Sequence, residues 1–437
     1  MTRPDPDTVA ALLAAARADR DAFEARWQDA ESELARVVSR RLRRNLGRVR
    51  SRSRRWLAET GQPRSAPSDK TPIAALPGQI LVETMALEEP VRTGIARVLV
   101  NLSRAMSDLA PGRLVPVGLA EQHWRRATEH GEELALSRPA GHLPAAGAPV
   151  LLGVSITAPA SLPDWEQAIT AFRRDGGRYA QVVHDLLPEQ LPDFFTSGLR
   201  TQFGEWLRIV LEQADVVLAN SHSTLTDLQH YARQHGLDGP RRELVFHPGV
   251  SQDTVPAHRV ACQHPVILAV GTVEPRKGYQ VLADAAAEVW AQRPDVEFVV
   301  VGGPGWGHCD VGERLAALDR SDFPFRWLRH ASDAELAAQY ARAHVLVQAS
   351  YGEGFGLPVV EASAAGVRVL ARDIGVFREV LGQQGAFFSH DAALGERILE
   401  VLGSAEAVPA AAPPTWGEAA TAILKTIDEI SDPDTAT

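Results

Sequence analysis

Short apolar runs alternate with longer amphipathic stretches from Gln79 to Leu370, and this alternation limits the possible folds more than any other feature of the chain. The runs are rich in Val, Ile and Leu, whereas stretches such as Gly94–Leu109 and Phe203–Gln213 carry apolar residues at helical spacing. An order of strand, helix, strand predicts parallel sheets that are covered by helices on both faces. The predicted strands are Gln79–Glu83, Arg113–Val117, Val150–Val154, Tyr179–Val183, Val216–Ala219, Glu243–Phe246, Val266–Val270, Glu297–Val301, Phe325–Leu328, Val345–Gln348 and Val367–Leu370.

Eleven predicted strands are too many for one ordinary doubly wound sheet, so we expect two such sheets. The pattern breaks near His247–Pro265, where a His-Pro-Gly-Val sequence and a polar stretch follow the sixth strand. A (β/α)8 barrel is the rival fold, but it requires eight strand–helix units and this chain has more. We therefore predict an α/β fold with two Rossmann-like, doubly wound parallel-sheet domains and a possible hinge at Gly249 between them.

The N-terminal region carries a different pattern. Asp7–Trp56 contains no proline and predicts a helix, and its part Arg36–Trp56 holds ten arginines and no acidic residue. A basic amphipathic helix that lies on an anionic membrane surface is one interpretation. A solvated helix that packs on its own protein, or on a second copy as a homo-oligomer, is the other. Nucleic acid is not an expected partner, because no aromatic platform or reading motif accompanies the charge.

Composition excludes several classes of protein. The 437 residues are 45% hydrophobic and 23% charged, with a formal net charge of −10, so wholesale disorder is excluded. The two cysteines, Cys262 and Cys309, form no CxxC pair, which argues against a disulfide framework or a cysteine zinc site. No segment approaches the ~18 apolar residues of a membrane span, and Met1–Asp7 does not begin a secretory signal. We expect a cytoplasmic protein, peripheral on the inner membrane face if the arginine-rich helix binds lipid.

Loops after the strands of the second half are candidate sites, because doubly wound domains bind ligands beyond the carboxyl ends of their strands. GTVEPRKG, residues 271–278, places the adjacent cations Arg276 and Lys277 after a strand. An arginine fork with a compact ammonium group suits a diphosphate, and Lys277 is one of only three lysines in the chain. The alternative is a solvated pair of surface cations. The loop is not a Walker A motif, because no Ser or Thr follows the lysine.

Two further loops carry glycine-rich sequences. GGPGWG, residues 302–307, lacks the GxGxxG spacing of a dinucleotide site, so we reject NAD binding and expect only a close backbone approach near a base or sugar. In EGFGLPVVE, residues 353–361, Pro358 suits the first turn of a helix, and Glu353 and Glu361 can accept hydroxyl groups of a sugar and a ribose. Acidic residues that merely complement a helix dipole are the alternative. The loop 371–380 is expected to be a supporting wall.

The sequences GTVEPRKG, VVVGGPGWG and EGFGLPVVEA, in this order and spacing, resemble the nucleotide-sugar half of retaining glycosyltransferases with the GT-B fold, specifically glycosyltransferase family four. DIGVFREV and TWGEAATAILKTIDEI extend the resemblance. In the first half, GIAR, HDLLP and ANSHS resemble the glycine turn, the HDxxP segment and the NSxS segment of that family. The resemblance covers about Gln79 to Ile430 and includes bacterial mannosyl- and rhamnosyltransferases of surface polysaccharide synthesis.

The residue pattern of the first 78 residues and the resemblance of the rest together give a domain plan for the whole chain. A helical arginine-rich extension (1–60) and a linker (61–78) precede an N-terminal Rossmann-like acceptor domain (79–250). A C-terminal Rossmann-like nucleotide-sugar domain (251–415) follows, and a last helix (416–437) returns toward the N-terminal domain. These two domains would face one another across a cleft, as in the GT-B fold.

The resemblance also implies roles for individual residues. Arg276 and Lys277 would bind the donor diphosphate, and Glu361 would hold the ribose hydroxyls. His184 would lie near the anomeric carbon, with Asp185 beside it on the acceptor side. Many members of the family carry a basic residue where Thr272 stands, so charge neutralisation would rest more heavily on the adjacent cations. The remaining predicted donor-binding residues are Gly94, approaching the phosphate from the opposite domain, and Glu353 with Gly354, Phe355, Gly356 and Leu357, holding the donor sugar.

The expected reaction is retaining transfer of a sugar from a nucleotide-diphosphate sugar to a glycan or lipid-linked acceptor, with GDP-mannose and dTDP-rhamnose ahead of UDP-sugars as donors. We expect neither a metal nor a cofactor, and His184, Glu353, Arg276 and Lys277 are the predicted catalytic residues. The alternatives are another GT-B enzyme, such as a sugar-nucleotide epimerase or a phosphorylase, and a non-catalytic sugar-nucleotide-binding scaffold.

Overall fold

A computed structural model describes residues 73–87, 94–120, 122–127, 130, 134, 147–155, 162–256, 258–305, 310–404 and 412–432. The predicted arginine-rich extension (1–60), with Arg36–Trp56, lies outside these residues, as does most of the predicted linker. The chain divides into two compact units. Met1–Pro67 with Trp290–Pro294 forms one, of which only Trp290–Pro294, a helix end and the turn after it, is described. Ser68–Val289 with Asp295–Thr437 forms the other and contains both sheets.

The first sheet has seven strands in the order β3-β2-β1-β4-β5-β6-β7, and only β3 runs antiparallel to its neighbour. We call this sheet with its helices the first-sheet domain. Its strands are β1 (Ile80–Glu83), β2 (Leu114–Ala120), β3 (His123–Arg126), β4 (Val150–Gly153), β5 (Arg178–Val183), β6 (Val216–Ala219) and β7 (Arg242–Val245). Its helices are η1 (Met85–Leu87), α3 (Gly94–Leu109), α4 (Leu162–Arg174), α5 (Leu187–Gln190), η3 (Pro192–Phe194), α6 (Ser197–Gln213), α7 (His222–His235) and the last helix, α14 (Trp416–Ser431).

The second sheet has six strands, all parallel, in the order β10-β9-β8-β11-β12-β13. We call this sheet with its helices the second-sheet domain. Its strands are β8 (Val266–Val270), β9 (Glu297–Val301), β10 (Phe325–Leu328), β11 (Val345–Gln348), β12 (Arg368–Arg372) and β13 (Ala386–Phe388). Its helices are η4 (Gln252–Thr254), η5 (Pro275–Lys277), α8 (Tyr279–Gln292), α9 (Asp310–Asp319), α10 (Asp333–Arg342), α11 (Leu357–Ala364), α12 (Gly375–Leu381), η6 (Gly382–Gln384), η7 (Asp391–Ala393) and α13 (Leu394–Gly403).

Both faces of the first sheet are buried, which explains its continuous apolar strands. Along β1, Ile80 and Val82 point into one core while Leu81 points into the other, because successive side chains of a strand lie on opposite faces. All three side chains are fully buried. The core on the side of Ile80 also contains apolar residues of α3 and α14.

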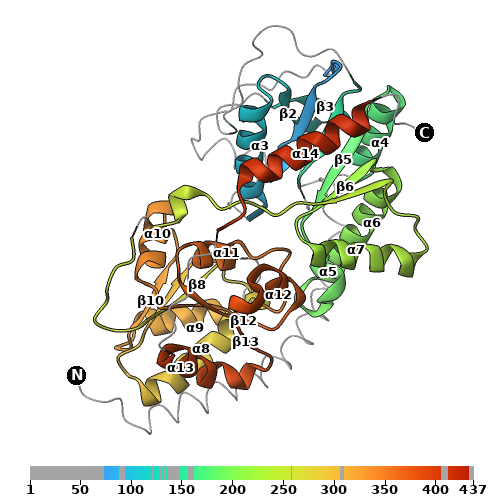
Figure 1. The fold of residues 1–437 in the computed structure, drawn as a ribbon. Coiled ribbons are helices and arrows are strands. Elements are labelled where there is room, and N and C mark those ends of the chain that lie inside the picture. Colours follow the sequence, from blue (N-terminus) through green and yellow to red (C-terminus); the bar gives the residue numbers. More distant parts are fainter. Residues whose placement is uncertain are drawn as a thin grey trace, which may run out of the picture. The chain divides into compact units, whose positions relative to one another are not determined.

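Helix α14 lies along α3, although more than 300 residues separate them in the sequence (Figure 1). Its buried stripe includes Ile423 and Ile427, which belong to the core of the first sheet. Thr415 and Glu418 form a capping box at the start of the helix. At its far end Asp428 forms an ion pair with Arg113 at 2.7 Å. The last helix therefore packs on the first-sheet domain.

The predicted fold class is confirmed, since two doubly wound parallel sheets are present and no single barrel is formed by the described residues. Two strands were not predicted from the sequence, β3 and β13. β3 is the short polar run His-Trp-Arg-Arg at an edge, and β13 has only three residues. The boundaries of the predicted domains stay predictions.

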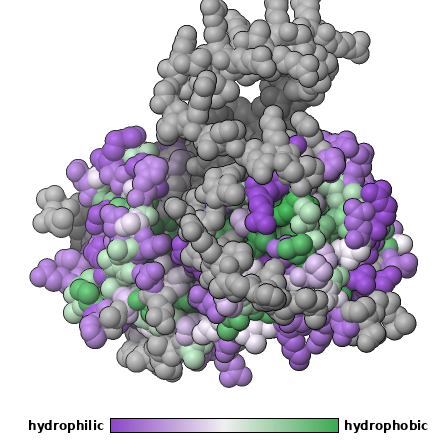
Figure 2. All heavy atoms as spheres, turned by 90° about the horizontal axis from the view of Figure 1, so that it is seen from above, coloured by the Kyte–Doolittle hydropathy of each residue, from purple (hydrophilic) through white to green (hydrophobic). Residues whose placement is uncertain are grey.

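Large apolar side chains are rarely exposed in the described part of the molecule. The exposed ones are Leu76, Leu109, Leu199 and Val260, which lie far apart in the sequence. On the face that Figure 2 shows, hydrophilic residues prevail at the rim, with smaller hydrophobic areas between them. No helix among the described residues is long and apolar enough to span a membrane.

Candidate functional site

The two loops that the sequence marks for a diphosphate and a sugar leave neighbouring strands. β8 pairs with β9 on one side and β11 on the other, so the strand order reverses between β8 and β11. Open α/β sheets bind ligands at such a reversal, beyond the carboxyl ends of the strands. Residues 271–278 follow β8 and residues 349–356 follow β11. The loops are joined, because the backbone N–H of Tyr351 donates to the carbonyl of Arg276 at 2.9 Å.

A cluster of two cations and two carboxylates lies at these loops. Nζ of Lys277 is 2.5 Å from Oε1 of Glu353, and Nη1 of Arg276 is 3.6 Å from Oε2 of the same residue. Nη2 of Arg276 is 2.7 Å from Oε1 of Glu274. The side chain of Glu353 is only 9% exposed and that of Lys277 12%, so water screens their attraction weakly.

Glu353 is held as an anion in this cluster. Burial alone would raise its pKa, but Lys277 and Arg276 outweigh burial and lower the pKa to about 2. Ser350 Oγ and Gln348 Nε2 also donate to Oε1 of Glu353, at 2.7 and 3.2 Å. The two cations predicted to bind a diphosphate are therefore both paired with a carboxylate in the structure.

The turn before α11 depends on two glycines. Gly356 has a φ of 88°, in the left-handed region that favours glycine. A Cβ on Gly354 would lie 1.8 Å from the carbonyl oxygen of His184, so only glycine permits this approach. The carbonyl of Gly354 accepts hydrogen bonds from Ser221 Oγ at 2.7 Å and Thr224 Oγ1 at 3.3 Å. EGFGLP thus meets the HDLLP and ANSHS segments of the first-sheet domain.

Glu361 on α11 is 1% exposed, and its partners differ from those of Glu353. The hydroxyl groups of Tyr340 and Thr254 donate to its carboxylate at 2.9 and 3.4 Å, and Nη2 of Arg97 lies 2.9 Å from Oε1. Burial raises the pKa of Glu361, and these partners offset the rise only in part. Arg97 belongs to α3, so this ion pair joins the two sheet domains at the carboxylate predicted to bind a ribose.

His184 follows β5 and is 5% exposed. Its Nε2 lies 2.7 Å from the carbonyl of Val154, which can only accept, so Nε2 carries the proton. Burial lowers the pKa of His184, against the hydrogen bond to Val154 and the charge of Asp185, so the imidazole is neutral at neutral pH. Asp185 accepts from the backbone N–H of Leu187 at 3.1 Å, and burial raises its pKa while Arg276 opposes the rise.

The GGPGWG loop approaches protein backbone. A Cβ on Gly302, whose φ is 150°, would lie 2.0 Å from the carbonyl oxygen of Gly271. The backbone N–H of Val273 donates to the carbonyl of Gly303, and that of Gly305 to the carbonyl of Val273, at 2.9 and 3.0 Å. These glycines therefore seat the loop against residues 271–273. Residues 306–309 lie outside the described part of the chain.

The other predicted donor-binding residues surround these contacts. Gly94 begins α3, and a Cβ there would meet no atom of the described chain within 4 Å, so the space beside it is open. Thr272 is partly exposed, close enough to Gly305 that a Cβ on that glycine would lie 2.7 Å from its Cγ2. Phe355 is buried and stacks on the ring of His247 with 5.5 Å between centroids, and Leu357 starts α11.

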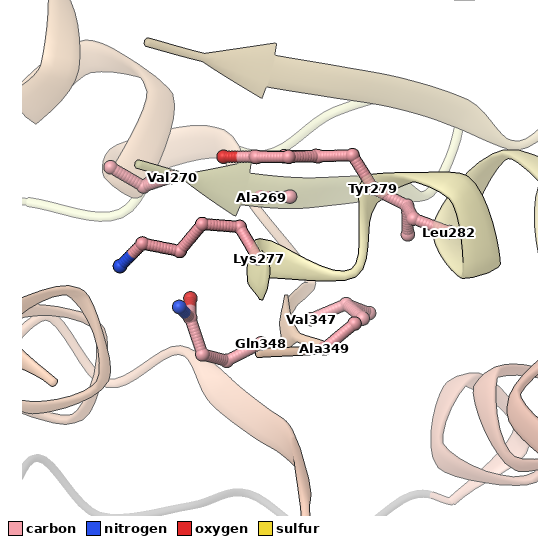
Figure 3. A pocket seen from close by; sticks show the side chains of 8 residues that line it. All are labelled: Ala269, Val270, Lys277, Tyr279, Leu282, Val347, Gln348 and Ala349. Atoms are coloured by element: carbon pink, nitrogen blue, oxygen red, sulfur yellow. The ribbon is translucent and has the colours of Figure 1, made fainter. Parts of the chain in front are cut away.

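A small cavity lies behind Lys277, between β8 and β11 (Figure 3). Its volume is about 10 Å³, close to the minimum for one water molecule. The residues that line it are Ala269, Val270, Lys277, Tyr279, Leu282, Val347, Gln348 and Ala349. The hydroxyl of Tyr279 donates to the carbonyl of Gly271 at 2.6 Å and so fixes the start of the neighbouring loop. This cavity is too small for a sugar or a nucleotide.

Sequence reasoning did not assign four residues that shape the site. Arg97 lies in the GIAR segment, and Glu274 lies two residues before Arg276 in GTVEPRKG, so both were within quoted motifs. Ser350 lies three residues before Glu353 and offered a weaker signal. Tyr340 has no local signal, because it comes from α10 and meets Glu361 only through the fold.

Residues 264–404 match the model of the family described as glycosyl transferases group 1. The serotype-specific mannosyltransferase WbdA of Escherichia coli is 33% identical over 258 residues, which cover 56% of this chain and 32% of that protein. D-inositol 3-phosphate glycosyltransferase of Mycobacterium sp. (strain KMS) is 33% identical over 178 residues, 38% of this chain and 39% of that protein. The chain thus spans about a third of the length of WbdA.

Solved structures with similar folds cover most of the chain. Anabaena Alr3699/HepE in complex with UDP-glucose superposes with a TM-score of 0.56 at 16% identity, over 81% of this chain and 95% of that one. WaaG, a glycosyltransferase involved in lipopolysaccharide biosynthesis, gives 0.53 at 15% identity, over 80% and 99%. These likenesses show the fold. Together with the family match, which lies within the second-sheet domain, they agree with the resemblance drawn from the sequence: residues 264–404 match the group 1 glycosyl transferases.

Proposed function

We propose that this chain is a retaining glycosyltransferase that moves a sugar from a nucleotide-diphosphate sugar to a glycan or lipid-linked acceptor of bacterial surface polysaccharide synthesis. The observation that carries the proposal is the cluster of Arg276, Lys277 and Glu353 at the carboxyl ends of β8 and β11. Such a place in a doubly wound sheet binds ligands, and these two cations match the charge of a diphosphate.

The chemistry of transfer assigns a role to each member of the cluster. As the bond from the sugar to the phosphate breaks, negative charge grows on the leaving diphosphate, where Arg276, Lys277 and the N-terminus of α11 can stabilise it. Glu353, relieved of one cation by the phosphate, is free to accept a hydroxyl group of the donor sugar. In a retaining reaction the leaving phosphate oxygen accepts the acceptor's proton, so no carboxylate base is assigned. Neither a metal nor a cofactor is required in this scheme.

We infer that the two sheet domains move apart at the EGFGLP turn as the donor enters. The cavity beside Lys277 holds about 10 Å³, and Gly354 contacts His184 through backbone atoms. Opening would break the Arg97–Glu361 ion pair and release the carboxylate that is proposed to bind the ribose. Closure around the donor would then exclude water from the reacting centre.

A mannosyl donor is favoured over other sugars. Three WbdA mannosyltransferases from Escherichia coli are 31 to 33% identical over 258 residues. GDP-mannose is therefore the first donor to test, followed by dTDP-rhamnose and then UDP-sugars, because the Alr3699/HepE structure contains UDP-glucose.

The test is release of nucleoside diphosphate from a donor panel, with and without a mannan-type or lipid-linked acceptor. Acceptor-dependent release with GDP-mannose is the expected result. A phosphorylase would form product only from the sugar phosphate and glycan, an epimerase would convert the donor without acceptor, and a scaffold would bind the donor without turnover. Any of these three results would replace the proposed reaction.

For the arginine-rich segment Arg36–Trp56 we propose contact with an anionic membrane surface. Replacing its arginines by glutamine in the full chain should abolish binding to vesicles that contain anionic lipid while sparing donor binding. If vesicle binding is unchanged, or if the substitutions abolish a dimer of this chain instead of vesicle binding, the segment contacts protein and not membrane.

A further inference from the structure

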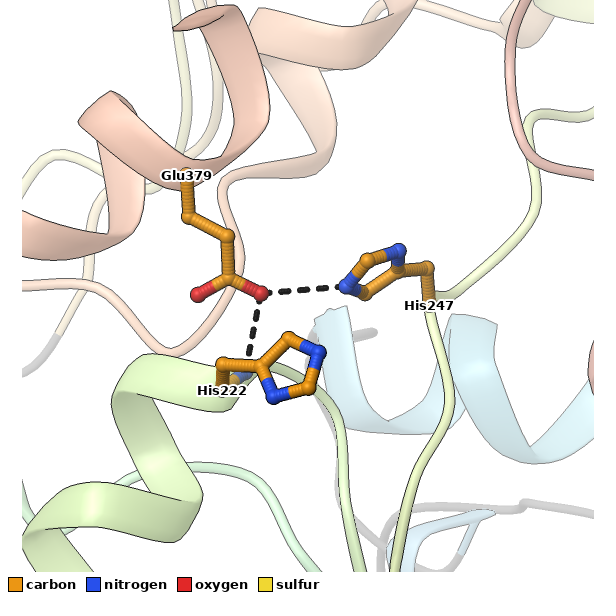
Figure 4. A group of neighbouring side chains, drawn as sticks. All are labelled: His222, His247 and Glu379. Carbon is orange, nitrogen blue, oxygen red and sulfur yellow. Dashed lines mark hydrogen bonds and ion pairs between the residues drawn. The ribbon is translucent and has the colours of Figure 1, made fainter.

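Three side chains from distant segments meet beside Phe355 of the EGFGLP turn. His222 is the first residue of α7, His247 lies in the chain that crosses between the sheets, and Glu379 belongs to α12 (Figure 4). Nε2 of His247 is 3.0 Å from Oε1 of Glu379, and the two imidazole centroids are 6.1 Å apart. One nitrogen or oxygen atom from each of the three lies within 4.8 Å of the others.

The carboxylate of Glu379 is oriented by backbone groups. The N–H groups of His222 and Ser223 donate to Oε1 and Oε2, at 2.8 and 2.9 Å. Burial alone would raise the pKa of Glu379, but His247 and these two N–H groups lower it, so the group is ionised at neutral pH. A carboxylate offers about four lone-pair positions. While the two N–H groups stay bound, the position on Oε1 that now faces His247 can bind an ion instead.

The two imidazoles are accessible from solvent, and one of them is also held in place. His222 is exposed and the side chain of His247 is 42% exposed, so an ion can arrive without unfolding the chain. The ring of His247 stacks on Phe355 at an interplanar angle of 27°. Water can occupy the coordination positions that the protein leaves open.

Two imidazoles and one carboxylate form a ligand set of defined chemical preference. Imidazole suits zinc, copper, nickel and iron, whereas magnesium and calcium prefer sets made of oxygen alone. Ligands of zinc lie at about 2.0–2.2 Å from the ion, so two atoms 3.0 Å apart, as Nε2 of His247 and Oε1 of Glu379 are, fit one ion. His222 reaches the same ion by a rotation of its exposed ring.

We propose that His222, His247 and Glu379 bind one divalent transition-metal ion of the zinc class. The ion would link α7, the segment between β7 and β8, and α12. In the metal-free chain Nε2 of His247 donates its hydrogen to Glu379; in the complex that hydrogen moves to Nδ1 and the Nε2 lone pair binds the ion. The site is separate from the Arg276–Lys277 cluster, so it does not rest on the proposed reaction.

The test uses the full chain after removal of metals with a chelator. Zinc is titrated in competition with a chromophoric chelator, and we expect saturation at one tightly bound ion per chain. His222→Ala and His247→Ala should each weaken binding at least about tenfold, since loss of metal-site partners has effects of this order or larger. His330→Ala, which removes another exposed histidine, should bind zinc like the unaltered chain.

Absence of saturable zinc binding, or unchanged affinity in both His222→Ala and His247→Ala, overturns the proposal and leaves the cluster as a hydrogen-bonded contact. Circular dichroism checks that each variant folds. If a variant does not, zinc-edge X-ray absorption of the unaltered chain decides. Two imidazoles and a carboxylate oxygen around the ion support the site, and any other number of imidazoles contradicts it.

Discussion

Glu353, in the loop ahead of α11, and Glu361, in α11 itself, are both buried. The two carboxylates differ in the charges that neutralise them. For Glu353, burial would raise the pKa, but two cations of the same domain lower it to about 2. For Glu361, burial prevails and the pKa is raised, because only Arg97, from the other sheet domain, opposes it with charge. One carboxylate is therefore fixed within its domain, and the other depends on the neighbouring domain for its partner.

This difference indicates which ion pair a bound donor would compete with. A buried carboxylate is costly unless it is paired, and two cations compensate the cost more fully than one. The partners of Glu353 are the proposed phosphate ligands, so a donor acts on this group by competing for Lys277 and Arg276. Under the proposed opening of the two sheet domains, α3 would withdraw Arg97 and release Glu361.

The largest expected effect comes from removing the cation nearest to Glu353. Lys277→Ala should lower acceptor-dependent release of nucleoside diphosphate by a factor of about 100 or more, as expected when one group that stabilises developing charge is lost. Lys425→Ala, which removes an exposed lysine of α14, is the matched control and should turn over like the unaltered chain. Equal turnover in the two variants would falsify the assignment of Lys277.

A change at Gly354 tests the turn before α11 without altering Glu353. In Gly354→Ala the new Cβ would lie 1.8 Å from the carbonyl oxygen of His184, and no side-chain rotation relieves a clash with backbone. We expect a loss of about 2 kcal/mol in the free energy of unfolding, as for other overpacked sites. Gly403→Ala is the control, because a Cβ there meets nothing within 4 Å. Equal melting temperatures of the two variants would show that the turn does not press on His184.

Glu353→Gln and Glu361→Gln should have opposite consequences at neutral pH. Glu353→Gln breaks a buried, doubly paired charge and should lower the free energy of unfolding by about 3 kcal/mol. Glu361→Gln removes a carboxylate whose ionisation is disfavoured by burial. It should raise the free energy of unfolding, by less than ~1 kcal/mol. Urea unfolding of the three proteins measures both changes.

The dependence on pH follows from the directions of the two pKa shifts. The folded pKa of Glu353 is about 2, below its ordinary value of 4.5, so its contribution to stability is present above 4.5 and disappears as the pH falls toward 2. Glu361 has a raised pKa, so its protonated form favours the folded chain. This contribution to stability is fully present below pH 4.5 and is lost as the pH rises through the folded pKa. A stability gap between Glu353→Gln and the parent that is constant from neutral pH to pH 2 would contradict this assignment.

The smallest effect concerns the ion pair across the domains. A double-mutant cycle of Arg97→Ala and Glu361→Gln should give a coupling energy of about 1 kcal/mol, as expected for partners in contact. Binding of a donor should reduce this coupling, because the proposed opening separates the pair. Two changes that simply add would indicate that Arg97 and Glu361 do not act together in solution.

Most of the fold could be predicted from the sequence because parallel strands buried on both faces leave an unbroken apolar signal. The run Val216–Ala219 is β6 without a change of boundary, and Gly94–Leu109 is α3. β3 escaped prediction since its polar residues at a sheet edge lack that signal. β13 escaped because three residues are too few to show any period.

The sequence indicated some residues of the candidate site but not the contacts between them. Position after a strand marked Arg276 and Lys277, and the E-x7-E spacing marked Glu353 and Glu361. That Lys277 meets Glu353, while Glu361 meets Arg97 from another domain, depends on how separate segments fold together, and no local pattern records it. The glycines of residues 302–305 do approach other parts of the chain closely: a Cβ on Gly302 would be nearest to Gly271, and one on Gly305 would be nearest to Thr272.

The central claim is that the cluster at β8 and β11 binds the diphosphate of a nucleotide sugar, and calorimetric titration with GDP and UDP tests it most directly. The unaltered chain should bind at least one of them saturably, with an affinity that Lys277→Ala lowers at least about tenfold and Lys425→Ala leaves unchanged. The same affinity in Lys277→Ala as in the parent, or no binding of either nucleotide, would contradict the account.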